Sequence, residues 1–276
     1  MKKWFAVIGN PISHSLSPTM HETWLKQLNL DASYIPIHVE LDHLEQAVES
    51  LKLLGCNGWN ITVPFKEAII PFLDAVDDSA RGIGAVNTVV KTKDNKYVGY
   101  NTDGLGFIES LGTILPEHNI LLLGAGGAAR GIAHAFKSLG FIQLTIANRT
   151  LAKATTLVDE LKIGQAVTLK DAENTLNEFD IVVQTTSLGM KSNDASLPIQ
   201  LNRLKENAIV ADIVYNPLVT PFLEEARKYN VRTINGLGML VHQGALAFSY
   251  WNGMKPDTDG MIQQLVEQIG GNYVNR

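Results

Sequence analysis

The stretch ILLLGAGGAARGIAHAF, residues 120–136, constrains the fold of this chain more than any other. A short apolar run leads into a glycine-rich turn, and a segment that opens with small residues follows it. Such a turn lets backbone amides approach a pyrophosphate, and the helix that follows adds partial positive charge at its amino terminus. The strand–turn–helix context favours a dinucleotide-binding unit over a merely tight turn. The glycines of the turn are Gly124, Gly126 and Gly127, and Ala128 and Ala129 stand where the usual pattern has a third glycine.

The next predicted strand of the same unit discriminates between cofactors. Enzymes that use NAD tend to place an acidic residue about 20 residues beyond the glycines, where it binds the ribose 2′-hydroxyl. Here the strand QLTIAN ends at Asn148, Arg149 and Thr150 follow it, and Lys153 lies one helical turn further on. A planar guanidinium binds a 2′-phosphate through two hydrogen bonds, whereas an acid repels it. The pattern therefore predicts NADP; the alternative is that Arg149 is a solvated loop residue.

Short apolar runs alternate with segments of helical period along the whole chain, which indicates parallel sheets with crossover helices. A break at Pro116–Asn119 separates two such series, so we expect two α/β domains joined near residues 104–118. The predicted strands are residues 4–10, 33–39, 58–63, 119–124, 143–148, 180–186, 208–215 and 231–236, with a hairpin turn at Asp94–Asn95. The predicted helices include 18–30, with Ser17 as N-cap, 41–55, a short one from Phe65, one from Gly104 to about Leu115, and two between Gly238 and Gly270.

Composition excludes several classes of function. The chain has 276 residues, 45% of them apolar and 18% charged, and a net charge of −5, so nothing attracts it generally to nucleic acid or anionic lipid. No run approaches the roughly 18 apolar residues of a membrane span, and the amino terminus lacks a signal-peptide core. Cys56 is the only cysteine, so no intrachain disulfide forms. We expect a soluble cytoplasmic protein with a small-molecule substrate.

Polar side chains in the first predicted domain gather where its strands end. Open α/β sheets bind ligands beyond the carboxyl ends of their strands, and hydroxyls and amides there suit a polyhydroxylated small molecule. Lys66 is the only lysine of this group, and Asp103 its only acid. The set comprises Ser15, Ser17, Asn60, Thr62, Lys66, Asn87, Thr88, Asn101, Thr102 and Asp103. Local roles compete with this interpretation, because Ser17 suits a helix cap and the segment from Asn101 to Gly104 suits a turn.

Other chemistries have little support in the sequence. The seven histidines show no zinc-binding spacing, and a single cysteine makes a thiolate metal site implausible, so we expect no metal. No G-x-S-x-G nucleophile motif occurs either.

The motifs, taken in order, resemble those of the shikimate dehydrogenase family. They are GNPISHSLSP at 9–18, NITVPFK at 60–66, GAVNT at 84–88, GYNTDG at 99–104, GAGGAAR at 124–130, ANRT at 147–150 and NGLGMLVHQG at 235–244. They span nearly the whole chain, which makes the resemblance far more specific than any one motif. It implies NADP-dependent, reversible reduction of 3-dehydroshikimate to shikimate in chorismate and aromatic amino acid biosynthesis.

The resemblance also implies a discontinuous architecture and a set of site residues. Residues 1–103 with 239–276 would form the substrate domain, with a mainly parallel sheet, and residues 104–238 a Rossmann-like NADP domain, with a cleft between the two. Lys66 and Asp103 would be the catalytic pair. The implied substrate residues are Ser15, Ser17, Thr62, Lys66, Asn87, Asp103, Tyr215 and Gln243. The implied cofactor residues are Gly124, Ala125, Gly126, Gly127, Ala128, Asn148, Arg149, Thr150, Lys153, Gly236 and Met239.

Three alternatives stay open. A quinate/shikimate dehydrogenase with relaxed substrate or NAD use has the same scaffold, although Arg149 counts against NAD. A non-catalytic NADP-binding relative is disfavoured by the presence of both Lys66 and Asp103. A folate-type methylene dehydrogenase is disfavoured because the hydroxyl-rich SHSLS and GYNTDG stretches do not suit a pterin. The protein is expected to be a monomer or a homodimer.

Overall fold

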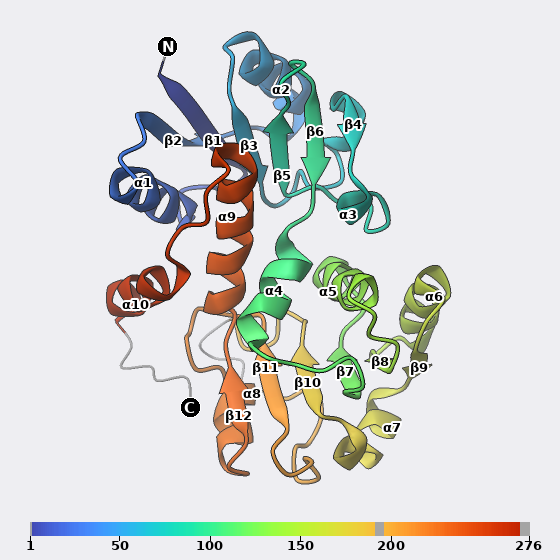
Figure 1. Cartoon of the computed structure of the whole chain (residues 1–276). Coiled ribbons are helices and arrows are strands. Elements are labelled where there is room, and N and C mark those ends of the chain that lie inside the picture. The colour runs from blue at the N-terminus through green and yellow to red at the C-terminus, as the bar shows by residue number, and fades with distance from the viewer. Residues whose placement is uncertain (1, 191–195, 271–276) are drawn as a thin grey trace. The chain divides into compact units, whose positions relative to one another are not determined.

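The computed structural model describes residues 2–190 and 196–270, which form two compact units. The first unit contains the described residues up to Thr102 together with Gln243–Met261, and the second contains Asp103–His242 and the described residues from Ile262. The boundary after Thr102 is one residue from the predicted domain boundary, and the boundary after His242 is four residues from the other. The described residues of each unit contain a six-stranded sheet (Figure 1).

The sheet of the first unit is mixed, with the strand order β2-β1-β3-β5-β6-β4. β1 is parallel to β2 and β3, whereas β5 is antiparallel to both β3 and β6. The strands are β1 (Lys3–Gly9), β2 (Ala32–His38), β3 (Gly58–Ile61), β4 (Ala75–Val76), β5 (Thr88–Lys91) and β6 (Tyr97–Tyr100). The helices before the boundary are α1 (Ser17–Gln27), α2 (Leu44–Leu53) and α3 (Asp78–Arg81), with 3-10 turns at Leu41–His43 and Ile70–Phe72.

Apolar side chains cover both faces of this sheet. On one face Ala6 and Ile8 of β1 pack with Val48 and Leu51 of α2. On the other, Phe5 stacks on Trp251 of α9 (Leu237–Asn252), with ring centroids 4.9 Å apart. The alternation along β1 follows the period of two residues of a β-strand.

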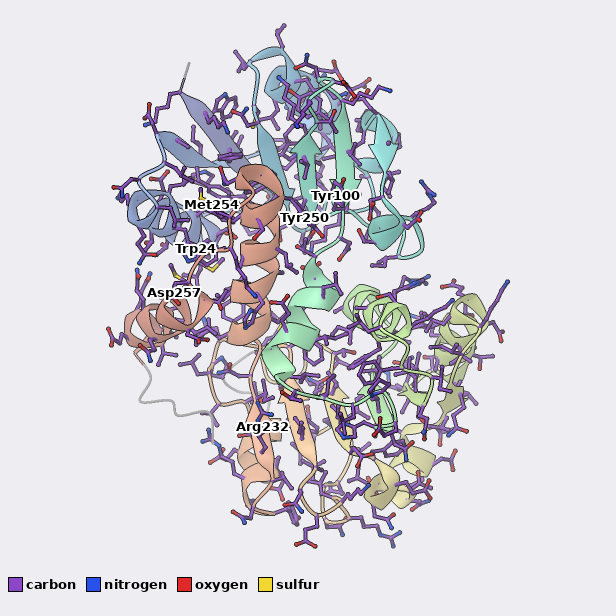
Figure 2. All side chains as sticks on the ribbon, in the orientation of Figure 1. Trp24, Tyr100, Arg232, Tyr250, Met254 and Asp257 are labelled. Carbon is purple, nitrogen blue, oxygen red and sulfur yellow. The ribbon has the colours of Figure 1, made fainter. Side chains whose placement is uncertain are left out.

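Hydrogen bonds and ring contacts attach the C-terminal segment of the first unit, Gln243–Met261, to the rest of that unit. The indole of Trp24 in α1 donates to the carbonyl of Asp257, just before α10 (Thr258–Ile269), and the indole of Trp251 donates to the carbonyl of Val89. The rings of Tyr100 and Tyr250 lie 5.0 Å apart (Figure 2). These contacts explain why Gln243–Met261 belong to the first unit although Asp103–His242 of the second unit precede them in sequence.

The sheet of the second unit is parallel throughout, with the order β12-β11-β10-β7-β8-β9. Numbered within the unit, this is the strand order 6-5-4-1-2-3 of a Rossmann fold. The strands are β7 (Ile120–Leu123), β8 (Leu144–Ala147), β9 (Gln165–Val167), β10 (Ile181–Gln184), β11 (Ile209–Asp212) and β12 (Arg232–Ile234). The helices are α4 (Asp103–Leu111), α5 (Gly127–Ser138), α6 (Leu151–Leu161), α7 (Leu169–Asn174) and α8 (Pro221–Arg227), with a 3-10 turn at Leu176–Glu178.

The continuous apolar run of β7 reflects burial on both faces of this sheet. Ile120 and Leu122 pack into a cluster with residues of α4, α5 and α6, while Leu121 and Leu123 pack with residues of α7 and α8. Strands of parallel sheets read as unbroken hydrophobic runs for this reason. The predicted strand 119–124 is therefore confirmed.

Three local predictions were wrong. Ser17 is the first residue of α1 rather than its N-cap, and its own amide donates to the hydroxyl of Ser15 at 3.3 Å. The segment from Phe65 forms turns and a short 3-10 helix instead of an α-helix, because Pro71 has no amide to donate. α4 ends at Leu111, since Gly112 adopts φ +72° and ends the helix before the predicted Leu115.

Candidate functional site

In the second unit the predicted cofactor residues lie at the carboxyl edge of the parallel sheet. Cα pairing places Leu123 beside Ala147 and Gln184, and Gln184 beside Asp212, so the loops that follow β7, β8, β10 and β11 leave one edge together. This edge is where open α/β sheets bind their ligands. The glycine turn follows β7, and Asn148, Arg149 and Thr150 follow β8.

The glycine turn has the backbone geometry that a phosphate cradle needs. Gly124 adopts φ +120°, and a Cβ built on it would lie 2.5 Å from the hydroxyl of Thr185, so only glycine fits there. A Cβ built on Gly126 or Gly127 would meet no atom within 4 Å, so the chain leaves open space in front of these residues. The first amides of α5 have no acceptor within the helix. The turn can therefore receive a pyrophosphate, as expected for a dinucleotide.

The edge beyond β8 carries positive charge and no acid. Arg149, Thr150 and Lys153 are exposed, and among the described residues no ion pair involves Arg149 or Lys153. The side chain of Asn148 donates to the carbonyl of Thr150 at 2.9 Å, which fixes the start of the loop. An exposed guanidinium beside an ammonium suits a 2′-phosphate, so these residues fit NADP.

Hydrogen bonds also hold the loop after β11 and join it to the turn before α9 at this edge. Sequence reasoning missed the residues that form these bonds. Buried Asp212 accepts from the amide of Val214 at 3.0 Å and from the hydroxyl of Thr220 at 2.7 Å. Burial raises the pKa of Asp212 to about 6. These bonds frame the loop that carries Tyr215, whose pKa burial also raises. The only sequence signal was an acidic residue at the end of an apolar strand.

The same loop meets the turn before α9. The side chain of Asn235 donates to the carbonyl of Leu218 at 3.0 Å, and the amide of Gly236 donates to the carbonyl of Val214 at 3.0 Å. A Cβ on Gly236 would collide with the carbonyl oxygen of Ile213. The close approach of two backbones therefore explains this glycine. Gly236 and Met239, both predicted near the cofactor, belong to the second unit, as do Asp103 and Tyr215 from the substrate list.

In the first unit the predicted substrate residues lie at one sheet edge. β1 and β3 are parallel neighbours, so the loops that carry Ser15 and Lys66 leave the same edge. Across the sheet the register pairs Asn60 with Thr88 and Thr88 with Tyr100, which places the start of β5 and the end of β6 at that edge too. The structure brings together in this unit Ser15, Ser17, Thr62, Lys66, Asn87 and Gln243.

A buried network of hydrogen bonds connects several of these groups. The amide of Asn87 donates to the hydroxyl of Thr102 at 2.9 Å and to Oε1 of Gln243 at 3.3 Å. Its Oδ1 accepts from the amide of Thr102 at 2.9 Å and from the hydroxyl of Thr88 at 3.0 Å. Asn60 donates to Thr88 and accepts from the hydroxyl of Tyr34. Sequence reasoning did not single out Tyr34, because it lies within a strand rather than at its end.

The structure also bears on metals and membranes. No group of three or more His, Cys, Asp or Glu side chains among the described residues is placed to hold a metal ion. No helix within residues 2–190 and 196–270 has the length and hydropathy of a membrane span.

A Rossmann-order sheet with an open glycine turn and a cationic edge defines the class of dinucleotide-dependent oxidoreductases. Family models narrow this class: the shikimate dehydrogenase substrate binding domain matches residues 7–89, shikimate/quinate 5-dehydrogenase matches 109–239, and the shikimate 5′-dehydrogenase C-terminal domain matches 236–266. The chain belongs to the shikimate dehydrogenase family.

Known proteins resemble the chain over almost its full length. A shikimate dehydrogenase (NADP(+)) of Lysinibacillus sphaericus (strain C3-41) is 54% identical over 99% of this chain and 100% of that protein. The crystal structure of shikimate 5-dehydrogenase from Thermus thermophilus in complex with NADP(H) and shikimate is 36% identical. It matches with a TM-score of 0.86 over 97% of this chain and 99% of that one.

The crystal structure of shikimate 5-dehydrogenase from Listeria monocytogenes in complex with shikimate and NAD is 32% identical, with a TM-score of 0.90 over 96% of both chains. These relatives confirm the predicted family, the two-domain α/β fold class and the assignment to the NADP-dependent oxidoreductases.

Proposed function

We propose that the chain catalyses the reversible, NADP-dependent reduction of 3-dehydroshikimate to shikimate, a step of chorismate and aromatic amino acid biosynthesis. The observation that carries the proposal is the carboxyl edge of the second sheet. There an open glycine turn is followed by the exposed Arg149, which stands in place of the acid of NAD enzymes, in a chain 54% identical to an NADP(+) shikimate dehydrogenase.

The cofactor residues are assigned by their place at that edge. Gly124, Ala125, Gly126, Gly127 and Ala128 would hold the pyrophosphate through backbone amides. Asn148, Arg149, Thr150 and Lys153 would hold the 2′-phosphate and its ribose. Gly236 and Met239, at the start of α9, would lie against the nicotinamide. When bound, NADP supplies or accepts the hydride.

Lys66 and Asp103 are the proposed catalytic pair. An ammonium stabilises the negative charge that develops on the carbonyl oxygen during reduction and donates a proton to that oxygen. In the reverse direction the amine receives the proton from the hydroxyl. Asp103 would orient the ammonium and accept a hydrogen bond from a neighbouring hydroxyl of the substrate. Asp103 is the first residue of α4, and the positive end of a helix dipole favours a carboxylate there.

The other substrate groups are hydroxyls and amides. Ser15, Ser17, Thr62, Asn87, Tyr215 and Gln243 would bind the hydroxyls and carboxylate of shikimate. A site that hydrogen-bonds each hydroxyl discriminates against analogues that lack one, because its own polar groups are then left unpaired.

Lys66→Ala tests the catalytic assignment. If Lys66 acts mainly in the transition state, kcat falls by about two orders of magnitude or more, while KM for shikimate changes far less. The measurement is initial-rate kinetics followed by NADPH absorbance, with Lys96→Ala, an exposed lysine of the β5–β6 turn, as the control. Near-normal kcat with collapsed substrate binding would make Lys66 a binding residue instead.

One alternative retains specific support. A matching model is described as shikimate/quinate 5-dehydrogenase, and the Listeria enzyme is in complex with shikimate and NAD, so relaxed substrate or cofactor use is the second candidate. We also propose a cytoplasmic location, and a monomer or homodimer as the oligomeric state. The predicted domain boundaries belong to the same proposal, supported by the division into two units and by the limits of the matching models.

A further inference from the structure

A hydrogen-bond network of buried polar side chains crosses the first unit from β2 to α9, and the substrate assignment does not account for all of its members. Its inner members are Tyr34, Asn60 and Thr88, each less than a tenth exposed. None of the three belongs to the proposed substrate set. The network ends at Asn87 and Gln243, which do belong to the proposed substrate set.

A backbone group shows which terminal atom of the Asn87 side chain is the oxygen. The amide of Thr102 can only donate, and it lies 2.9 Å from one terminal atom of the Asn87 side chain, which must therefore be Oδ1. The other terminal atom is then Nδ2. It donates to Oε1 of Gln243 at 3.3 Å, which leaves the amide nitrogen of Gln243 as the donor on its opposite side. A ligand that approaches that nitrogen must offer an oxygen acceptor.

A backbone group identifies the terminal atoms of the Asn60 side chain in the same way. The carbonyl of Asn87 can only accept, and it lies 3.2 Å from one terminal atom of the Asn60 side chain, which must be Nδ2. Oδ1 of Asn60 then faces Tyr34, so the Tyr34 hydroxyl is the donor of that bond, at 2.7 Å. Asn60 Nδ2 also donates to Thr88, whose hydroxyl in turn donates to Oδ1 of Asn87 at 3.0 Å.

The Tyr34 hydroxyl therefore supplies the proton for Oδ1 of Asn60, and it also forms a hydrogen bond with the side chain of Ser17, a proposed substrate residue. Without the hydroxyl of Tyr34, Oδ1 of Asn60 is a buried acceptor that has lost this donor, and leaving such a group unsatisfied costs more than the bond itself contributes. Rotation of the Asn60 amide is the available relief. That rotation breaks the bonds to Thr88 and to the Asn87 carbonyl and turns an acceptor toward the Thr88 hydroxyl, so Oδ1 of Asn87 keeps the Thr102 amide as a donor but loses Thr88.

We propose that Tyr34 is a positioning residue for the substrate site: through Asn60 and Thr88 it stabilises the orientation of the Asn87 and Gln243 side-chain amides. Tyr34 does not itself touch substrate in this proposal. The inference rests on the proposed function, because it takes Asn87 and Gln243 as substrate groups.

The test compares two buried tyrosines of the same unit. Tyr34→Phe removes the hydroxyl that donates to Asn60 and keeps the ring, whose centroid lies 4.2 Å from that of the stacked His21 ring. Tyr97→Phe is the matched control. Tyr97 is equally buried, and its hydroxyl donates to the carbonyls of Cys56 and Lys52, which do not belong to the network. Both variants lose buried hydrogen bonds, so both lose stability to a similar degree.

Only Tyr34→Phe should alter substrate binding. We expect its KM for shikimate to rise about fivefold, the loss of roughly one hydrogen bond, with kcat and the KM for NADP within about twofold of wild type. A KM for shikimate at least twice that of Tyr97→Phe supports the proposal, and a smaller difference overturns it. Because Tyr34→Phe also removes the bond to Ser17, Thr88→Val is the second required variant: it interrupts the network between Asn60 and Asn87, leaves the bond between Tyr34 and Ser17 in place, and must exceed the same threshold against Tyr97→Phe.

A readout without turnover separates this inference from the proposed function. Side-chain amide NMR signals of Asn60 and Asn87 should shift in Tyr34→Phe and keep their positions in Tyr97→Phe. A wild-type protein that does not oxidise shikimate would refute the proposed function, whereas an active wild type with unmoved amide signals in Tyr34→Phe would refute the positioning role alone.

Discussion

His21 gives the sharpest prediction about stability. Its side chain is 1% exposed, and it is surrounded by the rings of Tyr34, Trp24, Phe248 and Trp251. Nε2 of His21 has no hydrogen-bond partner among the described residues. Burial in this apolar setting lowers the pKa of His21 from 6.5 to about 3, so the folded protein holds it neutral at any moderate pH.

The sign and size of the effect follow from the two pKa values. The folded pKa lies below the unfolded one, so the unfolded chain binds the proton first, and the contribution of His21 is lost as the pH falls below 6.5. Between pH 7 and pH 5 this linkage removes about 2 kcal/mol from the free energy of unfolding. Asp212 acts in the opposite direction, because its folded pKa of about 6 is raised, so only a comparison of variants isolates His21.

The assay is urea unfolding at pH 7 and pH 5 for wild type and His21→Phe. Phenylalanine keeps an aromatic ring against Tyr34 and cannot titrate, while Asp212 and every other group remain the same in both proteins. Wild type should lose about 2 kcal/mol more than His21→Phe over this interval. Equal losses in the two proteins, to within about 0.5 kcal/mol, would refute the assignment of a buried, neutral His21.

Three further predictions concern the second unit and the cysteine. Arg149→Ala should raise the KM for NADPH at least tenfold more than the KM for NADH. An equal rise in both would show that Arg149 does not bind the 2′-phosphate. Gly104→Ala places a Cβ against the carbonyl oxygen of Gly131 and should cost roughly 1–3 kcal/mol in thermal unfolding. Gly126→Ala, whose Cβ meets no atom within 4 Å, should leave the Tm unchanged, and a similar loss in both would contradict the packing argument. Burial raises the pKa of the Cys56 thiol to about 12, so Ellman's reagent should label it only after unfolding; rapid labelling of the native protein would contradict this.

Most of the fold could be predicted because strong local signals agree with the tertiary structure. β7 is apolar on both faces and is bounded by a glycine turn, and the hairpin turn at Asp94–Asn95 contains a residue at φ +60°, Asn95. Short edge elements were missed: β4 has two residues and β9 three, too few for a period to be visible. The segment after Phe65 has a helical composition, but Pro71 interrupts the hydrogen bonds of a helix.

The site could be predicted only where a residue type stands at a strand end. Arg149 and the glycines of the turn are found in this way, since their position and chemistry are both visible in the sequence. Tyr34 and Asp212 could not be found, because their roles depend on partners 26 and 8 residues away that only the folded chain brings within hydrogen-bond distance. The first pair depends on the strand order β2-β1-β3, and the second on the path of the loop between β11 and α8; neither is visible in a local stretch of sequence.

The proposed reaction is tested most directly by initial rates with shikimate and quinate, each against NADP and NAD. We expect the combination of shikimate and NADP to have the highest kcat/KM, at least tenfold above shikimate with NAD and above quinate with either cofactor. A higher kcat/KM with NAD, or with quinate, would contradict the roles proposed for Arg149 and for the hydroxyl-binding residues of the first unit.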